Sequence, residues 1–184
     1  MNVTAKRVAG FGLLLALALV LGLIDRAIPL SALLGGAMVP GIKLGLANTV
    51  LLWAVWRTDP LSCGVLMLLK VVLSGMLYGS LSGMLYSLSG GALSLAVMLG
   101  LHALFGRAEK HAAAAVILTS VAGAMAHNTG QVLAAAAAVH TPALLKTYLP
   151  VLLLAGAVVG VLTGIVTDRV LRAVRPVGKG GDIL

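Results

Sequence analysis

Long apolar stretches, separated by short polar or Gly- and Pro-rich segments, follow one another along the chain. A helix needs about 20 predominantly apolar residues to cross the hydrocarbon core of a bilayer. Six stretches approach this length, and we expect helices at about residues 7–27, 41–56, 61–78, 83–105, 113–139 and 148–170. The pattern therefore predicts an all-α integral membrane protein with about six transmembrane helices in a single membrane domain, residues 1–184.

The boundary between the third and fourth expected helices lies inside one continuous apolar region. Residues 61–105 are far too long for one crossing, so two helices must share them. The segment GSLSG at 79–83 has the glycine and serine content of a turn, and we place the break there. The pentapeptide SGMLY occurs on each side of this turn, at 74–78 and 82–86, which we attribute to chance similarity in a low-complexity region.

Composition and charge agree with a membrane location. The chain is 60% apolar and only 10% charged, whereas soluble domains are about 25% charged. Its 13 basic and 5 acidic residues give a net charge of +8, but the basic residues gather at the ends of the expected helices and aromatic residues make up 4%. This distribution indicates topology signals rather than nucleic-acid binding.

The positive-inside rule sets the expected orientation. With the N-terminus in the cytoplasm, nine of the 13 Lys and Arg residues lie on the cytoplasmic side and two on the opposite side. The remaining two, Lys43 and Lys70, fall within the expected helices. We therefore expect a multi-pass protein of the cell membrane with both termini in the cytoplasm.

Several kinds of chemistry are not expected of the chain. All five acidic residues fall in expected loops or at helix ends: Asp25, Asp59, Glu109, Asp168 and Asp182. No carboxylate is therefore expected at mid-membrane depth, which disfavours ion-coupled transport by this chain alone. No cluster of aspartates is present to hold magnesium and diphosphate, as a prenyl diphosphate synthase requires. A single cysteine provides no metal or redox motif, and we expect no catalytic residue, no metal and no cofactor.

Polar residues inside the expected helices point to a binding site, because each one costs free energy in hydrocarbon unless it finds a partner. In PGIKLGLAN at 40–48, Lys43 lies near the start of a helix and Asn48 is more than one turn deeper. Lys43 either reaches the interface by snorkelling or contacts a ligand. For Asn48, a hydrogen bond that links two helices competes with a substrate role.

A second group climbs one face of the third expected helix, where Lys70, Ser74 and Tyr78 follow one another at intervals of four residues. A lysine near mid-span costs roughly 2.5 to 3.5 kcal/mol on insertion scales. We therefore expect Lys70 to face a cavity, an anion or carbonyl groups rather than lipid.

A third group lies in AHNTGQ of the fifth expected helix. His127 and Gln131 are four residues apart and share one face, with Asn128 adjacent. Gly123 and Gly130 lie beside this face and allow another helix to approach closely. A polar pocket face and a hydrogen-bonded packing face are both consistent with this pattern.

We expect these groups to converge on one pocket. Because two lysines would lie in the membrane with no buried acid to neutralise them, the ligand should be anionic or rich in hydrogen-bond acceptors. The candidate substrate-binding residues are Lys43, Asn48, Lys70, Tyr78, His127, Asn128 and Gln131.

Three stretches of the sequence carry a family resemblance that extends over nearly the whole chain. PGIKLGLAN at 40–48, SLSGGALS at 87–94 and GAMAHNTGQ at 123–131 resemble the Gx-transporter family, also labelled heptaprenyl diphosphate synthase component I. The resemblance implies a six-helix protein of the bacterial inner membrane, similar to the substrate-binding S components of energy-coupling factor transporters. Such a protein is surrounded by membrane lipid, binds a small molecule, and works with a transmembrane coupling subunit and ATPase subunits.

The resemblance also implies two other functions. The family label implies a membrane component linked to heptaprenyl diphosphate or quinone synthesis, although the aspartates of such an enzyme are missing. Members are also associated with flavin- and quinone-linked extracellular electron transfer, which implies an accessory role there. Lys70 occupies a position where the family leads us to expect Arg, so the charge is kept but the planar guanidinium is lost.

Overall fold

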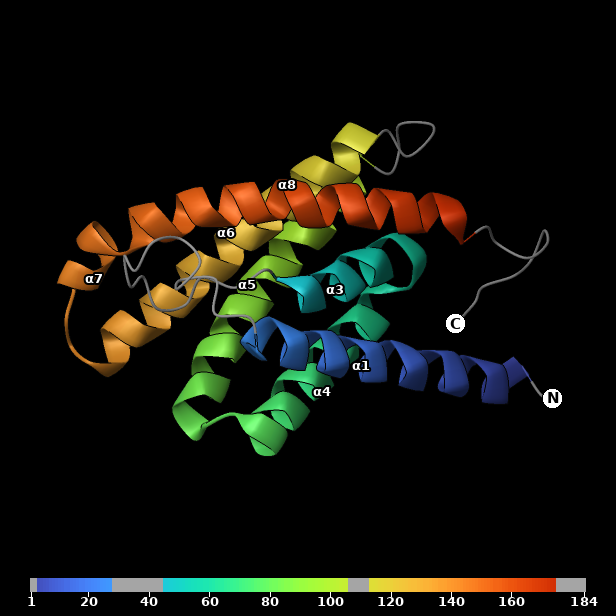
Figure 1. Cartoon of the computed structure of the whole chain (residues 1–184), viewed down its shortest axis with the longest axis horizontal. Helices are drawn as coiled ribbons and strands as arrows, with labels where there is room; N and C mark the ends of the chain where they lie inside the picture. Colours follow the sequence, from blue (N-terminus) through green and yellow to red (C-terminus); the bar gives the residue numbers. More distant parts are fainter. Residues whose placement is uncertain (1–2, 28–44, 106–112, 175–184) are drawn as a thin grey trace.

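The computed structural model describes residues 3–27, 45–105 and 113–174, and nearly all of them are helical (Figure 1). The helices are α1 (Val3–Ala27), α3 (Leu46–Arg57), α4 (Pro60–Tyr78), α5 (Leu81–Phe105), α6 (Ala113–Ala138), α7 (Ala143–Thr147) and α8 (Leu149–Ala173). No strand occurs in these ranges, and the predicted all-α membrane fold is confirmed.

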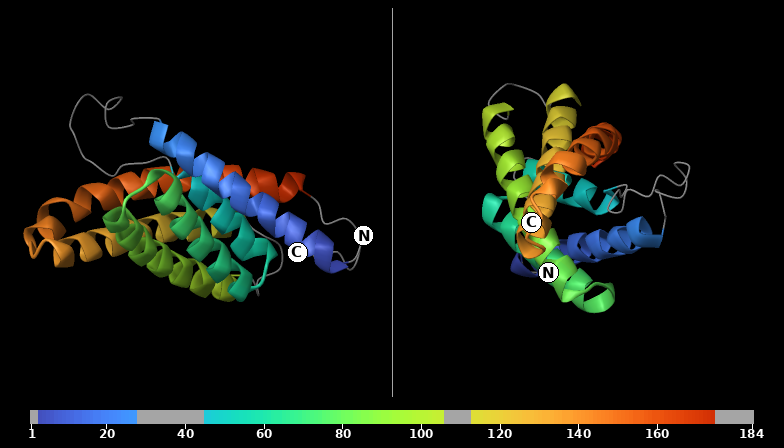
Figure 2. Two further views of the ribbon diagram at one scale, coloured as in Figure 1. Left: turned by 90° about the horizontal axis from the view of Figure 1, so that it is seen from below. Right: turned by 90° about the vertical axis from the view of Figure 1, so that its left-hand side faces the viewer.

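Helix α3 is the centre of the bundle. It lies between α8 and α1 in Figure 1 and contacts both of them, as well as α4, α5 and α6. All seven residues from Val50 to Trp56 are buried. When the molecule is seen from below, α1 runs alongside α3 and α4 (Figure 2). On the other side of the bundle α6 packs against both α5 and α8.

Four of the described helices are long and apolar enough to cross a membrane, namely Arg7–Ala27 of α1 and the whole of α4, α5 and α8. They expose large apolar side chains, such as Leu13, Met76 and Leu154, on the outside of the bundle. Surfaces of this kind suit lipid rather than water. The chain is therefore a membrane protein.

The other two helices expected to cross the membrane, α3 and α6, differ from the prediction in different ways. Helix α6 has 26 residues and is long enough, but polar residues interrupt it. Helix α3 has 12 residues and spans about 18 Å, less than the hydrocarbon core of about 30 Å. The expected crossing at 41–56 is thus only partly seen, since its first residues lie outside the described ranges and α3 begins after Gly45, which has a positive φ of 67°.

The connections between helices follow local chemistry. Asp59 caps α4, where Pro60 occupies the first turn, and the Asp59 carboxylate accepts hydrogen bonds from Ser62 N at 2.8 Å and Ser62 Oγ at 2.7 Å. The turn between α4 and α5 lies at Gly79 and Ser80, so α5 begins two residues earlier than predicted. The short helix α7 occupies a segment that was expected to be a loop.

Candidate functional site

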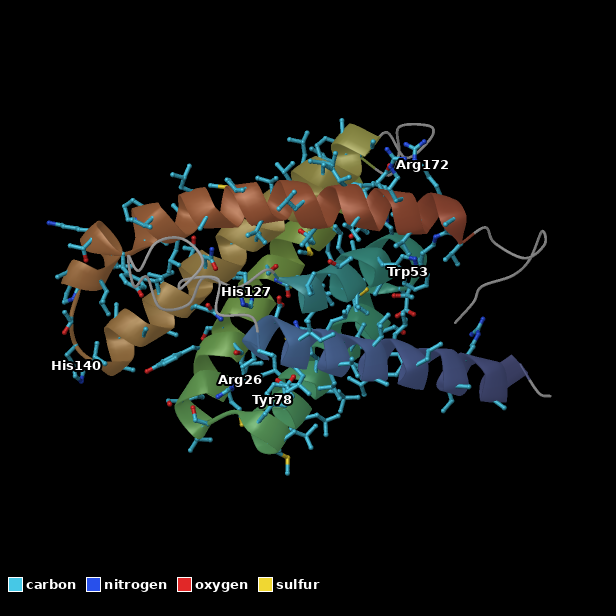
Figure 3. All side chains as sticks on the ribbon, viewed as in Figure 1. Arg26, Trp53, Tyr78, His127, His140 and Arg172 are labelled. Carbon is cyan, nitrogen blue, oxygen red and sulfur yellow. The ribbon has the colours of Figure 1, made fainter. Side chains whose placement is uncertain are left out.

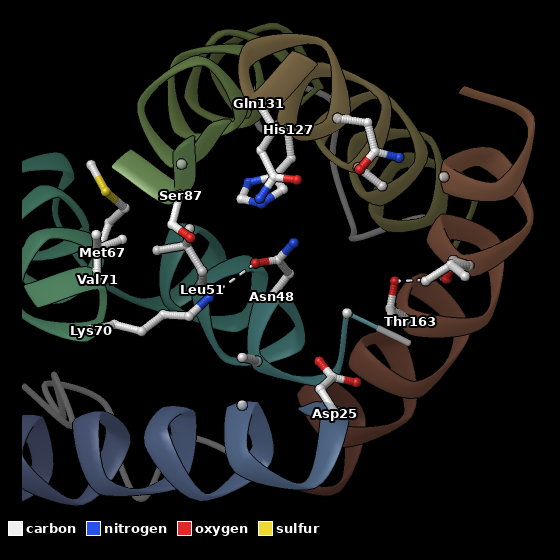
Figure 4. A pocket seen from close by; sticks show the side chains of 18 of the residues that line it. Asp25, Asn48, Leu51, Met67, Lys70, Val71, Ser87, His127, Gln131 and Thr163 are labelled. Carbon is white, nitrogen blue, oxygen red and sulfur yellow. Dashed lines mark hydrogen bonds between the residues drawn. The ribbon is translucent and has the colours of Figure 1, made fainter. Parts of the chain in front are cut away.

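A cavity of about 150 Å³ lies inside the bundle, and α1, α3, α4, α5, α6 and α8 all contribute to its wall (Figure 4). Part of this wall is aliphatic, including Leu51, Met67 and Val71. The polar side chains on the wall are Asp25, Asn48, Lys70, Ser74, Tyr78, Ser87, Ser120, His127, Asn128, Gln131 and Thr163. Such a mixed wall can hold a small molecule through a few polar groups in an apolar surround.

The structure brings together six of the seven candidate residues predicted from the sequence. Asn48, Lys70, Tyr78, His127, Asn128 and Gln131 all line this cavity. The seventh, Lys43, lies outside the described residues. Figure 4 shows that Lys70 and Asn48 enter from neighbouring helices, while His127 approaches from the opposite side.

The half-buried Lys70 makes a specific contact on the cavity wall. Its Nζ donates a hydrogen bond to Oδ1 of Asn48 at 3.1 Å, which joins α4 to α3 (Figure 4). Hydrogen bonds to ionised groups are stronger than neutral ones, so the amide oxygen offsets part of the cost of holding an ammonium group here. Asn48 therefore links two helices, as one reading of the sequence predicted, and also faces the cavity.

Asp25 was missed as a site residue. It lies near the end of α1 with only 6% of its surface exposed, and it lines the same cavity as Lys70. The expectation that no acid would be buried is therefore wrong. Asp168 is also 6% exposed and forms an ion pair with Arg172 at 2.9 Å. The prediction of an anionic or acceptor-rich ligand assumed that no buried acid accompanied the lysines, and Asp25 removes that assumption.

Tyr78 closes the wall where α4 meets α1. Its hydroxyl donates to the carbonyl oxygen of Leu19 at 3.3 Å, and its ring centroid lies 6.0 Å from the guanidinium carbon of Arg26 (Figure 3). Gly22 permits this contact, because a Cβ at that position would lie 2.9 Å from the hydroxyl oxygen. The phenol thus ties the end of α1 to the end of α4.

The polar face of α6 serves both packing and the cavity. Asn128 Nδ2 donates to the carbonyl oxygen of Leu152 at 2.6 Å, which links α6 to α8. Ser120 and Thr163 make a second link between the same helices, with 2.9 Å between their hydroxyl oxygens. Asn128 therefore makes a packing contact between helices, one of the two roles that the sequence left open for this face, and it also lines the cavity.

Two glycines, Gly90 of α5 and Gly130 of α6, allow these two helices to approach closely beside the cavity. A Cβ on Gly130 would lie 2.6 Å from the carbonyl oxygen of Ser89, and one on Gly90 would lie 2.7 Å from that of His127. The predicted close approach beside Gly130 is confirmed. It holds His127 and Gln131 against α5 at the edge of the cavity.

The described residues offer little to a metal or an aromatic cofactor. They contain no group of three His, Cys, Asp or Glu that could hold a metal ion. The described part of the wall carries one Phe, Tyr or Trp ring, that of Tyr78, besides the imidazole of His127, so it offers little aromatic surface to a planar ligand. The wall is instead suited to hydrogen bonds and charge contacts with a small aliphatic or polar molecule.

Comparison with known proteins gives one family. The family model described as heptaprenyl diphosphate synthase component I matches residues 14–170. No match was found among curated proteins or among solved structures. The matched range includes every described residue named above as lining the cavity.

Proposed function

We propose that this chain, which belongs to the heptaprenyl diphosphate synthase component I family, binds a small solute as the substrate-specific subunit of an ATP-driven uptake transporter. The observation that carries the proposal is the cavity, whose wall includes an ammonium, a carboxylate, an imidazole and several amides. Ionisable groups in a membrane bundle are costly and mark ligand or ion pathways. A protein that needed only a stable bundle would gain from apolar residues at these positions.

Partner subunits supply the energy in this proposal. The sequence contains no GxxxxGK[ST] phosphate-binding motif, so ATP hydrolysis falls to another chain. Helix α1 offers one face for a membrane partner, since Gly12 has no heavy atom within 4 Å of an added Cβ and Ala16 is also exposed. Small residues allow helices to pack closely in a bilayer.

The family description favours a second function, a membrane component of heptaprenyl diphosphate synthesis. In that case the chain would hold or orient a soluble catalytic partner, because magnesium-diphosphate chemistry requires clustered carboxylates. Asp25 and Asp168 are the two buried acids of the described helices, and these helices contain no group of three His, Cys, Asp or Glu that could hold a metal ion.

The identity of the proteins that bind this chain in a fixed ratio distinguishes solute uptake from prenyl diphosphate synthesis. The tagged chain would be purified from the membrane of the cells that produce it, and each co-purifying subunit identified and assayed. Uptake predicts ATPase subunits and ATP-dependent solute accumulation in vesicles that carry the complex. A soluble partner that forms prenyl diphosphate from both prenyl substrates and magnesium would contradict uptake, as would prenyl transfer by the isolated chain.

A further inference from the structure

We propose that the solute is a small zwitterion whose ammonium group contacts Asp25 and whose anionic group contacts Lys70. This inference rests on the proposed function and names the chemical class of its substrate. Asp25 comes from α1 and Lys70 from α4, and both belong to the wall of one cavity (Figure 4). The described wall thus presents one carboxylate and one ammonium group to whatever occupies it.

The charges of the wall discriminate between ligand classes. An anion would gain from Lys70 but would be repelled by the carboxylate of Asp25, and a simple cation would face the reverse situation. Coulomb interactions are much stronger in a protein interior than in water, so either mismatch is costly. A molecule that carries both charges matches both groups.

The two side chains have the bonding capacity for such a ligand. A carboxylate has about four acceptor positions, so Asp25 can hold an ammonium group while it keeps contacts to the protein. Lys70 has three N–H donors and gives one to Oδ1 of Asn48, so an anionic group of the ligand can share the ammonium with acceptors of the protein. The bond to Asn48 also fixes the position of the Lys70 ammonium group, which favours a ligand that binds in one defined orientation.

The size and lining of the cavity narrow the class further. A cavity of about 150 Å³ has room for a molecule of roughly the size of benzene. The aliphatic part of the wall, which includes Leu51, Val71 and Val159, suits a short branched or linear side chain. These properties fit a small α-amino acid better than a nucleotide, a prenyl diphosphate or a flavin.

The test is a matched ligand series on the full chain in nanodiscs made without phosphatidylethanolamine. Equilibrium binding would be measured for proteinogenic amino acids of at most about eight non-hydrogen atoms, which is close to the size of benzene. Each would be compared with the amine that lacks its carboxylate and the acid that lacks its ammonium group. For valine these are isobutylamine and isovalerate. At least one amino acid should bind ten times more tightly than both of its counterparts.

Two variants assign the two ends of the ligand. Asp25→Asn should weaken binding of that amino acid at least tenfold and leave binding of the matching acid unchanged or tighter. Lys70→Met should weaken the amino acid similarly and spare the matching amine. Asp168→Asn is the control, because Asp168 is as buried as Asp25 but does not line the cavity.

Each outcome has a defined meaning. If acids bind as tightly as amino acids and Asp25→Asn has no effect, the inference is wrong although solute binding stands. If no member of the series binds and the protein carries no small molecule from its own membrane, the inference and the proposed function both fail. An ethanolamine phospholipid held in the cavity of protein from its own membrane, identified by mass, would support the pairing of charges but contradict solute uptake.

Discussion

Lys70 Nζ donates a 3.1 Å hydrogen bond to Asn48 Oδ1, and through this contact α4 and α3 share the wall of the cavity. The two residues are 22 positions apart, and each was a candidate for a different reason. The contact gives Lys70 an acceptor in a place where an ammonium group is expensive. Because of this contact, the effect of a substitution at one of the two positions on the free energy of unfolding should depend on the residue at the other.

A double-mutant cycle should reveal this dependence. Asn48→Leu removes the acceptor and should lower the free energy of unfolding in detergent by roughly 1.5 to 3 kcal/mol, the usual contribution of a hydrogen bond to a charged group. In the Lys70→Met background the same change should cost far less, because no ammonium group needs the acceptor. Strictly additive effects would show that the bond contributes nothing.

The approach of α5 to α6 predicts unequal effects of two glycine substitutions. Gly130→Ala would place a Cβ 2.6 Å from the carbonyl oxygen of Ser89 and 2.9 Å from Cα of Gly90, so backbone must shift. We expect a loss of about 1 to 3 kcal/mol in the free energy of unfolding. Gly100→Ala is the control, since nothing lies within 4 Å of its added Cβ, and it should be neutral or stabilising. Equal thermal midpoints for the two variants would argue against the described packing.

Asp59 predicts a pH dependence at the start of α4. The two hydrogen bonds from Ser62 hold the pKa of its carboxyl group below the ordinary value of 3.8. The stabilisation is therefore fully present above that pH and is lost as the pH falls through the lowered pKa. Asp59→Ala should lower the thermal midpoint at pH 7, and the difference from the unmodified protein should shrink toward pH 3. Asp59→Asn keeps a neutral cap, and its thermal midpoint should lack this contribution to the pH dependence.

The charge distribution predicts that both ends of the chain lie in the cytoplasm. At each terminus, a fused reporter that works only in the cytoplasm should be active, and a reporter that works only outside it should be inactive. A cysteine introduced in the segment 140–146 should react with a membrane-impermeant label added from outside. A C-terminus accessible from outside would contradict this topology, as would protection of the introduced cysteine.

Helical spacing accounts for much of what the sequence could predict about the site. Residues at intervals of four positions share a helix face, which placed Lys70 with Ser74 and Tyr78, and His127 with Gln131. In the structure these five residues line one cavity. Their pairing across helices, such as Lys70 with Asn48, depends on tertiary packing and has no local signal in the sequence.

Two errors have identifiable physical causes. Asp25 stands at the end of an apolar run, which is usually an interfacial position, and only the packing of α1 against the other helices buries it. The helix expected over 41–56 is not continuous, because Gly45 has a positive φ outside helical geometry and α3 begins at Leu46, while residues 41–44 lie outside the described ranges. A hydropathy pattern depends on residue types alone, so it detects neither the burial of Asp25 by tertiary packing nor the backbone conformation of Gly45.

Native mass spectrometry of the unmodified protein and of Lys70→Met, both released directly from the membrane in which they were produced, tests the central claim most directly. The claim is that the cavity between Lys70 and His127 holds a small solute. We predict a bound small molecule on the unmodified protein and its loss or strong depletion on Lys70→Met, with equal thermal stability or a gain in the variant. If both proteins are free of any adduct, or if both carry the same adduct at equal occupancy, the cavity is not the solute site.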